Sequence, residues 1–299
     1  MPKPRAVLIV NPKTGRYTSR RTPSIQTICA DLQSLGVEVD LVSTTGPGDA
    51  ASIAAEAARD GVGQVIVSGG DGTINEAVQG LVGSETRLAI VPRGTANVLA
   101  RELGLPLDHR RAVEVIARGR ARRIHVGLAI DETNNTRRYF LLMAGIGLDA
   151  AVVSKVSPRL KKRLGKGAFW ITGLSQLADW HPVSFDLEVN GQIFPSTFAS
   201  VGNAPSYGGD LAITPRASLD KPEFEICIIH TANRVRYLQL LSYAMRKSGL
   251  QPNRKGVSFV RATRACAKGD VPVQVDGEVI GMLPMRFEIS PHSLEVIVP

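Results

Sequence analysis

The stretch that decides the fold runs from residue 65 to residue 76 and reads VIVSGGDGTINE. It opens with the β-branched run Val65–Val67, which is typical of a buried strand. After the glycines, apolar residues recur at the spacing of a helix. These are Ile74, Ala77, Val78, Leu81 and Val82. The pattern predicts a strand that passes through a glycine-rich turn into a helix.

The turn, Gly69-Gly70-Asp71-Gly72-Thr73, has the chemistry of a phosphate site. Glycines let backbone N–H groups approach an anion closely, and a helix start adds unpaired N–H donors and positive partial charge. A carboxylate among phosphates is repelled unless a cation lies between them, so Asp71 is predicted to face a Mg²⁺ ion held by a nucleotide. The alternative is a plain turn in which Asp71 is the helix N-cap.

A second turn repeats this arrangement. The strand-like run Leu88–Val91 is followed by the turn Pro92-Arg93-Gly94-Thr95-Ala96-Asn97 and the helical run Val98–Leu103. Thr95 and Asn97 offer side-chain donors beside the turn; in the alternative, Thr95 caps the helix and Asn97 lies on the surface. Both turns are expected side by side at the carboxyl edge of one parallel sheet, where open α/β sheets bind ligands.

These turns, with segments elsewhere, resemble the diacylglycerol kinase catalytic family, and particularly its bacterial soluble lipid kinases. A lone Gly-Gly-Asp-Gly also occurs in NAD kinases and phosphofructokinases, but the ordered set of segments is specific. Besides the two turns it comprises Asn11-Pro12-x-Thr14-Gly15, Thr44-x-x-x-Gly48-Asp49-Ala50, Ala144-Gly145-x-Gly147-Leu148-Asp149-Ala150, Leu164-Gly165-Lys166, Gly202-Asn203, Gly208-Gly209, Pro215-x-Ala217 and Asp276-Gly277-Glu278.

The resemblance runs nearly end to end and implies an ATP-dependent lipid kinase that uses Mg²⁺. It implies that Asp71 meets the metal through Mg·ATP and acts in catalysis. It also implies nucleotide contacts from Asn11, Thr44, Gly69, Gly70, Asp71, Gly72, Thr73, Ile74, Asn75 and Thr95. The alternatives are an NAD kinase-like small-molecule kinase, which the segments at 11–15, 92–97 and 276–278 disfavour, and a non-catalytic regulator that binds a nucleotide or a lipid.

Asp276-Gly277-Glu278 has two interpretations. By local chemistry it is a hairpin turn. The resemblance implies instead that Glu278 is the catalytic carboxylate, because a lipid hydroxyl needs a base to take its proton as the bond to phosphorus forms. A hairpin that presents Glu278 to the phosphate turn across a cleft is therefore expected.

The order of predicted elements indicates two domains. Residues 1–122 alternate strand and helix, which predicts an α/β nucleotide-binding domain with a parallel sheet. Residues 123–299 are mostly short alternating segments, with Asn190-Gly191 and Asp276-Gly277 as hairpin turns, which predicts an antiparallel β-rich sandwich that holds the lipid. Helices are expected near 166–177 and 234–247, and the last strand is expected to pack back near the first domain.

Composition limits the partners of the chain. Its 299 residues carry a formal net charge of +9, and its aromatic content is only 5%, without a stacking platform for nucleic acid. The basic clusters at 118–123 and 159–163 favour contact with an anionic membrane surface, although a solvated basic face is the alternative. The first candidate for the contact is the set Arg159, Lys161, Lys162 and Arg163.

The remaining features fit a cytoplasmic protein that is peripheral at the inner membrane face. The longest apolar run, 140–148, is too short to cross a bilayer, and the three cysteines are scattered and expected to be reduced. The sequence permits a homodimer. Gly145-x-Gly147-x-x-Ala150 matches a dinucleotide motif but lacks the acidic residue downstream, and there is no Walker loop.

One departure from the family concerns a structural divalent ion. Ser218, Lys221 and Glu223 occupy the family's positions for this site, with Lys221 in place of an aspartate. An ammonium offers no ligand to a cation, so no divalent ion is predicted, and the ammonium is expected to donate to the same carbonyls. The alternatives are a metal restored by Asp220 and a Lys221 that is simply exposed.

Overall fold

The computed structural model describes residues 5–14, 23–147, 182–207, 211–233, 235, 239 and 256–299. Several predictions fall outside these residues. They are the helix at 166–177, almost all of the helix at 234–247, the basic cluster at 159–163, and the family residues Gly15, Leu148-Asp149-Ala150, Leu164-Gly165-Lys166 and Gly208-Gly209.

The chain divides into two compact units. Unit 1 comprises Met1–Ile124 and His292–Pro299, and unit 2 comprises His125–Pro291. The sequence placed the boundary at 122/123 and expected the last strand near the first domain. The C-terminal segment belongs to unit 1, where its strand joins the sheet.

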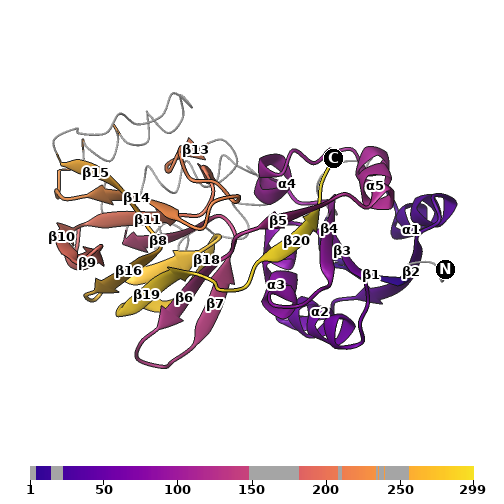
Figure 1. Cartoon of the computed structure of the whole chain (residues 1–299), viewed down its shortest axis with the longest axis horizontal. Helices are drawn as coiled ribbons and strands as arrows, with labels where there is room; N and C mark the ends of the chain where they lie inside the picture. Colours follow the sequence, from indigo (N-terminus) through magenta and orange to yellow (C-terminus); the bar gives the residue numbers. More distant parts are fainter. Residues whose placement is uncertain are drawn as a thin grey trace. The chain divides into compact units, whose positions relative to one another are not determined.

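Unit 1 is an α/β unit around one six-stranded sheet in the order β2-β1-β3-β4-β20-β5 (Figure 1). The strands from β2 to β20 are parallel, and β5 runs antiparallel to β20. The strands are β1 Arg5–Val10, β2 Glu38–Ser43, β3 Gln64–Gly69, β4 Arg87–Pro92, β5 Ala121–Ile124 and β20 Leu294–Ile297.

Helices lie on both faces of this sheet: α2 packs against α3, and α1 packs against α5 (Figure 1). The helices are α1 Ile25–Ser34, α2 Asp49–Arg59, α3 Asp71–Leu81, α4 Val98–Glu102 and α5 His109–Arg118. Val65–Val67 and Leu88–Val91 are buried, as β-branched runs in central parallel strands should be. Ile74, Val78 and Leu81 form the buried stripe of α3, which fixes how that helix leaves the glycine turn.

The described residues of unit 2 form two six-stranded antiparallel sheets and one short hairpin. The sheet orders are β10-β9-β16-β19-β6-β7 and β15-β14-β11-β8-β17-β18, and β12 pairs with β13. The strands are β6 Gly127–Asp131, β7 Arg137–Phe140, β8 Met143–Gly147, β9 Phe185–Val189, β10 Gln192–Ser196, β11 Phe198–Gly202, β12 Ser206–Tyr207, β13 Leu211–Ala212, β14 Phe224–Ile229, β15 Val257–Ala262, β16 Arg264–Lys268, β17 Pro272–Val275, β18 Glu278–Met282 and β19 Met285–Ile289.

Side chains from both sheets form one core in unit 2. Phe140 of β7 stacks on Phe224 of β14 with ring centroids 5.7 Å apart, and Leu187 and Phe287 join the same cluster. Both predicted hairpin turns are present: Asn190-Gly191 and Asp276-Gly277 have positive φ at both positions. The predicted fold class, a parallel α/β domain followed by an antiparallel β-rich sandwich, is confirmed.

Candidate functional site

The two glycine turns of unit 1 touch each other. β3 and β4 are neighbouring parallel strands in which Gly69 is opposite Pro92, and the Arg93 amide donates to the Gly69 carbonyl at 2.9 Å. A Cβ atom added to Gly94 would lie 2.7 Å from the Gly70 Cα. Any side chain at this contact would force the turns apart, which explains why the sequence has glycine at both positions.

The second turn is closed by Asn97. This residue has φ 48°, and its Oδ1 accepts from the Gly94 amide at 2.8 Å while its Nδ2 donates to the Gly94 carbonyl at 2.9 Å. Asn97 is also the N-cap residue of α4 and is buried, whereas Thr95 is exposed. The alternative in which Thr95 caps the helix and Asn97 lies on the surface is therefore wrong.

Asp71 connects the two turns. Gly70 is the N-cap residue of α3, and among the described residues no side chain caps that helix, so the N-cap alternative for Asp71 is wrong. Instead, its Oδ1 accepts from the Leu99 amide at 3.3 Å, at the start of α4. Burial raises the pKa of Asp71, and the amides around 97–99 partly oppose this by stabilising the carboxylate. A partly buried anionic group thus lies between the starts of α3 and α4.

The first loop is attached to the same turn by a side chain. Asn11 donates from Nδ2 to Thr73 Oγ1 at 3.1 Å, and its Oδ1 accepts from the Lys13 amide at 2.9 Å. Thr14 donates from Oγ1 to the Asn11 carbonyl at 2.6 Å. The loop after β1 is therefore held beside the first residues of α3.

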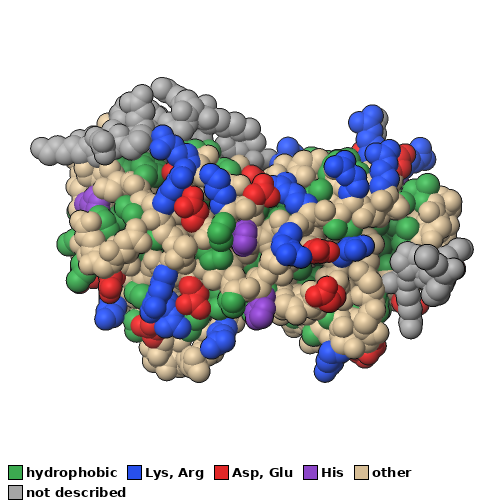
Figure 2. All heavy atoms as spheres, viewed as in Figure 1, with side chains coloured by type: hydrophobic (Ala, Val, Ile, Leu, Met, Phe, Trp, Pro, Cys, Tyr) green, Lys and Arg blue, Asp and Glu red, His purple; other side chains and the backbone are tan. Residues whose placement is uncertain are grey.

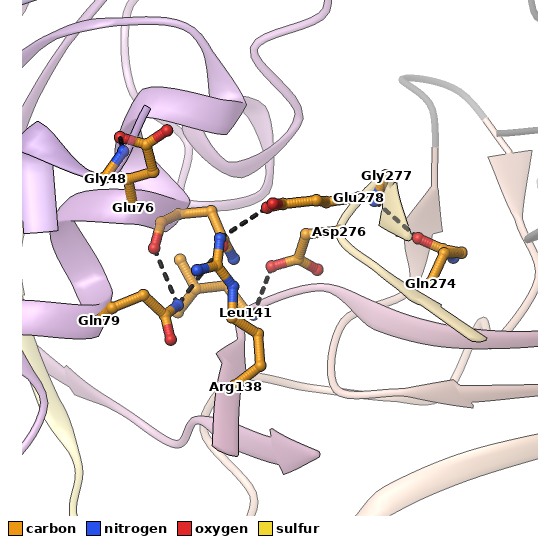
Figure 3. Close-up of polar contacts among 10 residues, drawn as sticks. Gly48, Glu76, Gln79, Arg138, Leu141, Gln274, Asp276, Gly277 and Glu278 are labelled. Carbon is orange, nitrogen blue, oxygen red and sulfur yellow. Dashed lines mark hydrogen bonds and ion pairs between the residues drawn. The ribbon is translucent and has the colours of Figure 1, made fainter. Parts of the chain in front are cut away.

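The second loop is shaped by Asp49. Its Oδ2 accepts from the Thr45 amide and hydroxyl, both at 2.7 Å, and from the Gly46 amide at 2.9 Å; these bonds lower the pKa of Asp49. The Gly48 amide donates to Glu76 Oε2 of α3 at 3.2 Å (Figure 3). The sequence analysis did not predict that Glu76 holds the second loop. The only indication was its position in the second turn of α3, close to the glycine turn.

The residues predicted to contact the nucleotide thus lie at one edge of unit 1, but they differ in how exposed they are to a ligand. Gly72 is exposed, and a Cβ added there would have no described atom within 4 Å. Thr44, Thr73 and Asn75 are buried, and Asn75 Oδ1 lies 3.4 Å from Gln79 Nε2. Ile74 is 1% exposed and its amide donates to Gly70, so its side chain belongs to the core.

Arg93 is a residue of this edge that sequence reasoning did not weigh. Burial lowers the pKa of its guanidinium, and its buried Nε has no hydrogen-bond partner among the described residues. The positive charge of Arg93 in this turn favours an anion nearby. The one indication of this role in the sequence was that a basic residue, Arg93, occupies the variable position of Pro92-x-Gly94-Thr95.

In unit 2, the turn at 276–278 is anchored at three points (Figure 3). The Asp276 carboxylate accepts from the amides of Leu141, Leu142 and Met143 at 2.7, 2.9 and 3.0 Å. The Gly277 amide donates to Gln274 Oε1 at 2.7 Å, and Arg138 Nη2 donates to Glu278 Oε2 at 2.6 Å. The Glu278 side chain is 61% exposed, so it is both held and accessible.

The segment at the family's divalent site is an ordinary turn. The Lys221 amide donates to the Ser218 carbonyl at 3.0 Å, and Glu223 pairs with Arg261 at 3.3 Å. Lys221 is exposed, and its ammonium has no partner among the described residues, so the expected donation to carbonyls is not seen there. Across the described part of the chain, no group of three or more His, Cys, Asp or Glu could hold a metal ion.

Comparison with known proteins identifies the family. The diacylglycerol kinase catalytic domain profile matches residues 5–129, and the YegS C-terminal NAD kinase beta sandwich-like domain profile matches residues 143–298. A diacylglycerol kinase of Bacillus subtilis (strain 168) is 31% identical over 302 residues, which cover 99% of this chain and 96% of that protein. The chain belongs to the diacylglycerol kinase family.

Other members of the diacylglycerol kinase family support this assignment. The diacylglycerol kinase of Staphylococcus carnosus (strain TM300) is 28% identical, with coverage of 99% of this chain and 95% of that protein. A crystal structure of a diacylglycerol kinase from Bacillus anthracis str. Sterne has the same fold, with a TM-score of 0.74, 21% identity and coverage of 99% and 97%. As a family member the chain is a kinase, so the non-catalytic alternative is not supported.

Among the described residues, no helix is long and apolar enough to cross a membrane.

Proposed function

We propose that this kinase transfers the γ-phosphate of Mg·ATP to the hydroxyl of a diacylglycerol-type lipid. The observation that carries the proposal is the contact between the two glycine turns, which leaves the start of α3 open at Gly72 and places Asp71 beside it. The relatives named diacylglycerol kinases support the lipid class.

The residues present fit a nucleotide with a divalent cation. The N–H groups at the start of α3, which no described side chain caps, suit the phosphates, and the positive charge of the Arg93 guanidinium suits the negative charge of the phosphates. Asp71 would hold Mg²⁺ through the nucleotide, and its carboxylate, which burial destabilises, gains from a nearby cation. Bound there, Mg²⁺ supplies neutralisation of the phosphate charge.

Glu278 serves as the base in this proposal. Its carboxylate takes the proton of the lipid hydroxyl while the hydroxyl oxygen bonds to the γ-phosphorus. The bond from that phosphorus to the bridging oxygen of ADP breaks, and ADP leaves. The exposed, anchored geometry of Glu278 supports this role, and the other protein groups act by positioning and charge.

We also propose peripheral contact with anionic membranes through exposed arginines of unit 1. Lys and Arg side chains gather over α5 and the nearby strands β5 and β20 (Figure 2). In the 118–123 cluster, Arg118 and Arg120 are exposed, while Arg123 is 3.7 Å from Glu295. Each basic residue near such a surface contributes about 1 kcal/mol, which salt screens.

The decisive experiment incubates the full chain with labelled ATP, Mg²⁺ and a panel of lipid micelles, and then extracts labelled lipid. We expect product from a lipid with a free hydroxyl beside acyl chains, and none without the divalent ion. NADP formed from NAD, with no labelled lipid from any member of the panel, would overturn the proposal in favour of an NAD kinase.

A further inference from the structure

The Glu278 carboxylate is bound at one oxygen only. Arg138 Nη2 lies 2.6 Å from Oε2, and the Arg138 side chain is 26% exposed against 61% for Glu278. Among the described residues, Oε1 of Glu278 has no hydrogen bond. One oxygen is therefore fixed by a partly buried cation, and the other is open to a ligand.

The backbone beneath this carboxylate is fixed independently. Asp276 accepts hydrogen bonds from three amides of the segment 141–143. Gln274 accepts one from the Gly277 amide (Figure 3). Because the turn is already held at these points, the Arg138 contact is not needed to place the hairpin. What Arg138 adds is the direction of a flexible, mostly exposed side chain.

We infer that Arg138 is a positioning residue for Glu278, which holds Oε2 so that Oε1 receives the proton of the lipid hydroxyl. The inference rests on the proposed function. Arginine suits the task because its guanidinium is permanently charged and rigid, and it donates to a carboxylate without competing for the proton.

A purely structural role is the competing explanation. Arg138 lies on β7 and Glu278 on β18, which are edge strands of the two different sheets, so the pair also ties the sandwich together. An exposed ion pair of this kind contributes little to stability. If the pair nevertheless mainly ties the two sheets together, Arg138→Gln should lower the melting temperature and leave kcat unchanged. If Arg138 positions Glu278, kcat should fall while the melting temperature changes little.

The test compares kcat, KM for ATP and melting temperature of the full chain, with diacylglycerol micelles and Mg·ATP, for four variants. These are Arg138→Gln, Arg138→Lys, Glu278→Gln and the double variant Arg138→Gln/Glu278→Gln. Arg137→Gln is the matched control, because Arg137 is the preceding residue of β7 and is exposed.

We expect Arg138→Gln to lower kcat about 10- to 100-fold, since a misplaced catalytic group can cost about 100-fold, while KM for ATP changes less than about threefold. Arg138→Lys should recover much of the loss, because the cation is kept. The double variant should be no slower than Glu278→Gln alone, because the inference assigns the effect of Arg138 on kcat to that carboxylate. Arg137→Gln should behave as the unaltered protein.

A kcat for Arg138→Gln equal to that of the control would overturn the inference while leaving the proposed function intact. So would a double variant clearly slower than Glu278→Gln. If Arg138→Gln does not fold, Arg138→Met, which keeps the aliphatic stem but removes the cation, replaces it: a kcat loss of about 10-fold or more supports the inference, and a kcat equal to that of Arg137→Gln refutes it. Absence of labelled lipid with the unaltered protein would instead overturn the proposed function and this inference with it.

Discussion

Gly72→Ala separates folding from nucleotide binding at the start of α3. A Cβ at Gly72 would have no described atom within 4 Å, and the residue lies in the first turn of a helix. Alanine is favoured over glycine in helices by about 0.5–1 kcal/mol. For a protein of this size that corresponds to a rise in melting temperature of roughly 1–4 °C. The unliganded variant should therefore be as stable as the original protein, or slightly more stable.

The same methyl group should obstruct a phosphate at the proposed site. If the phosphates approach the backbone at Gly72, the added methyl must be accommodated at a cost of about 1–3 kcal/mol, which weakens ATP binding roughly 5- to 150-fold. The assay is a thermal melt with and without Mg·ATP, since a ligand that binds the native state raises the melting temperature by mass action. We expect the ATP-induced rise to be lost and the unliganded melting temperature to be kept.

Gly80→Ala on the same helix is the matched control. Its Cβ would lie 2.3 Å from the Ala51 carbonyl oxygen and 2.6 Å from the Ala55 nitrogen, so α2 and α3 must separate. That variant should lose about 1–3 kcal/mol of stability but keep its ATP-induced rise. Unchanged ATP affinity in Gly72→Ala would refute the reasoning, because it would mean that no phosphate approaches this turn.

Three further predictions concern other residues. Burial raises the pKa of Asp71 in the folded state, so the native protein binds more protons than the unfolded chain, and stability falls as pH rises from about 4 through the native pKa. Asp71→Asn keeps an acceptor for the Leu99 amide but cannot ionise, so over that pH window it should gain stability relative to the unaltered protein. It should also lose activity at least about 100-fold. A difference in melting temperature between the two proteins that stays constant across pH would contradict the stability prediction. Asn97→Ala removes both hydrogen bonds to Gly94 and should lower the free energy of unfolding in urea by roughly 2 kcal/mol. Asn97→Gly should lose less, because glycine tolerates the φ of 48° at this position. Cys227 is fully buried, and burial raises the pKa of its thiol, so Cys227 should react with a thiol reagent only when the protein unfolds. The less buried Cys29 and Cys266 should react first. Rapid labelling of all three thiols in the native protein would disprove this prediction.

The sequence by itself determined the class of each unit and predicted where the candidate site lies. Val65–Val67 and the helical spacing after Gly72 were enough to predict the strand, turn and helix, because burial periodicity and glycine conformation are local properties. The positive φ of both residues in Asp276-Gly277 followed from residue type alone. The family resemblance could also be recognised in the sequence, since it rests on ordered short segments.

Only the tertiary structure decided which side chains hold the site together. Asp71 bonds to Leu99, Glu76 to Gly48 and Arg138 to Glu278, and in each pair the two residues are far apart in the chain. Such contacts depend on strand order and on which face each side chain takes, and no local propensity encodes either. Asn97 shows the same limit at short range: whether its amide turns outward to a ligand or inward to Gly94 depends on how closely Gly70 and Gly94 approach, and packing of the two strands sets that distance.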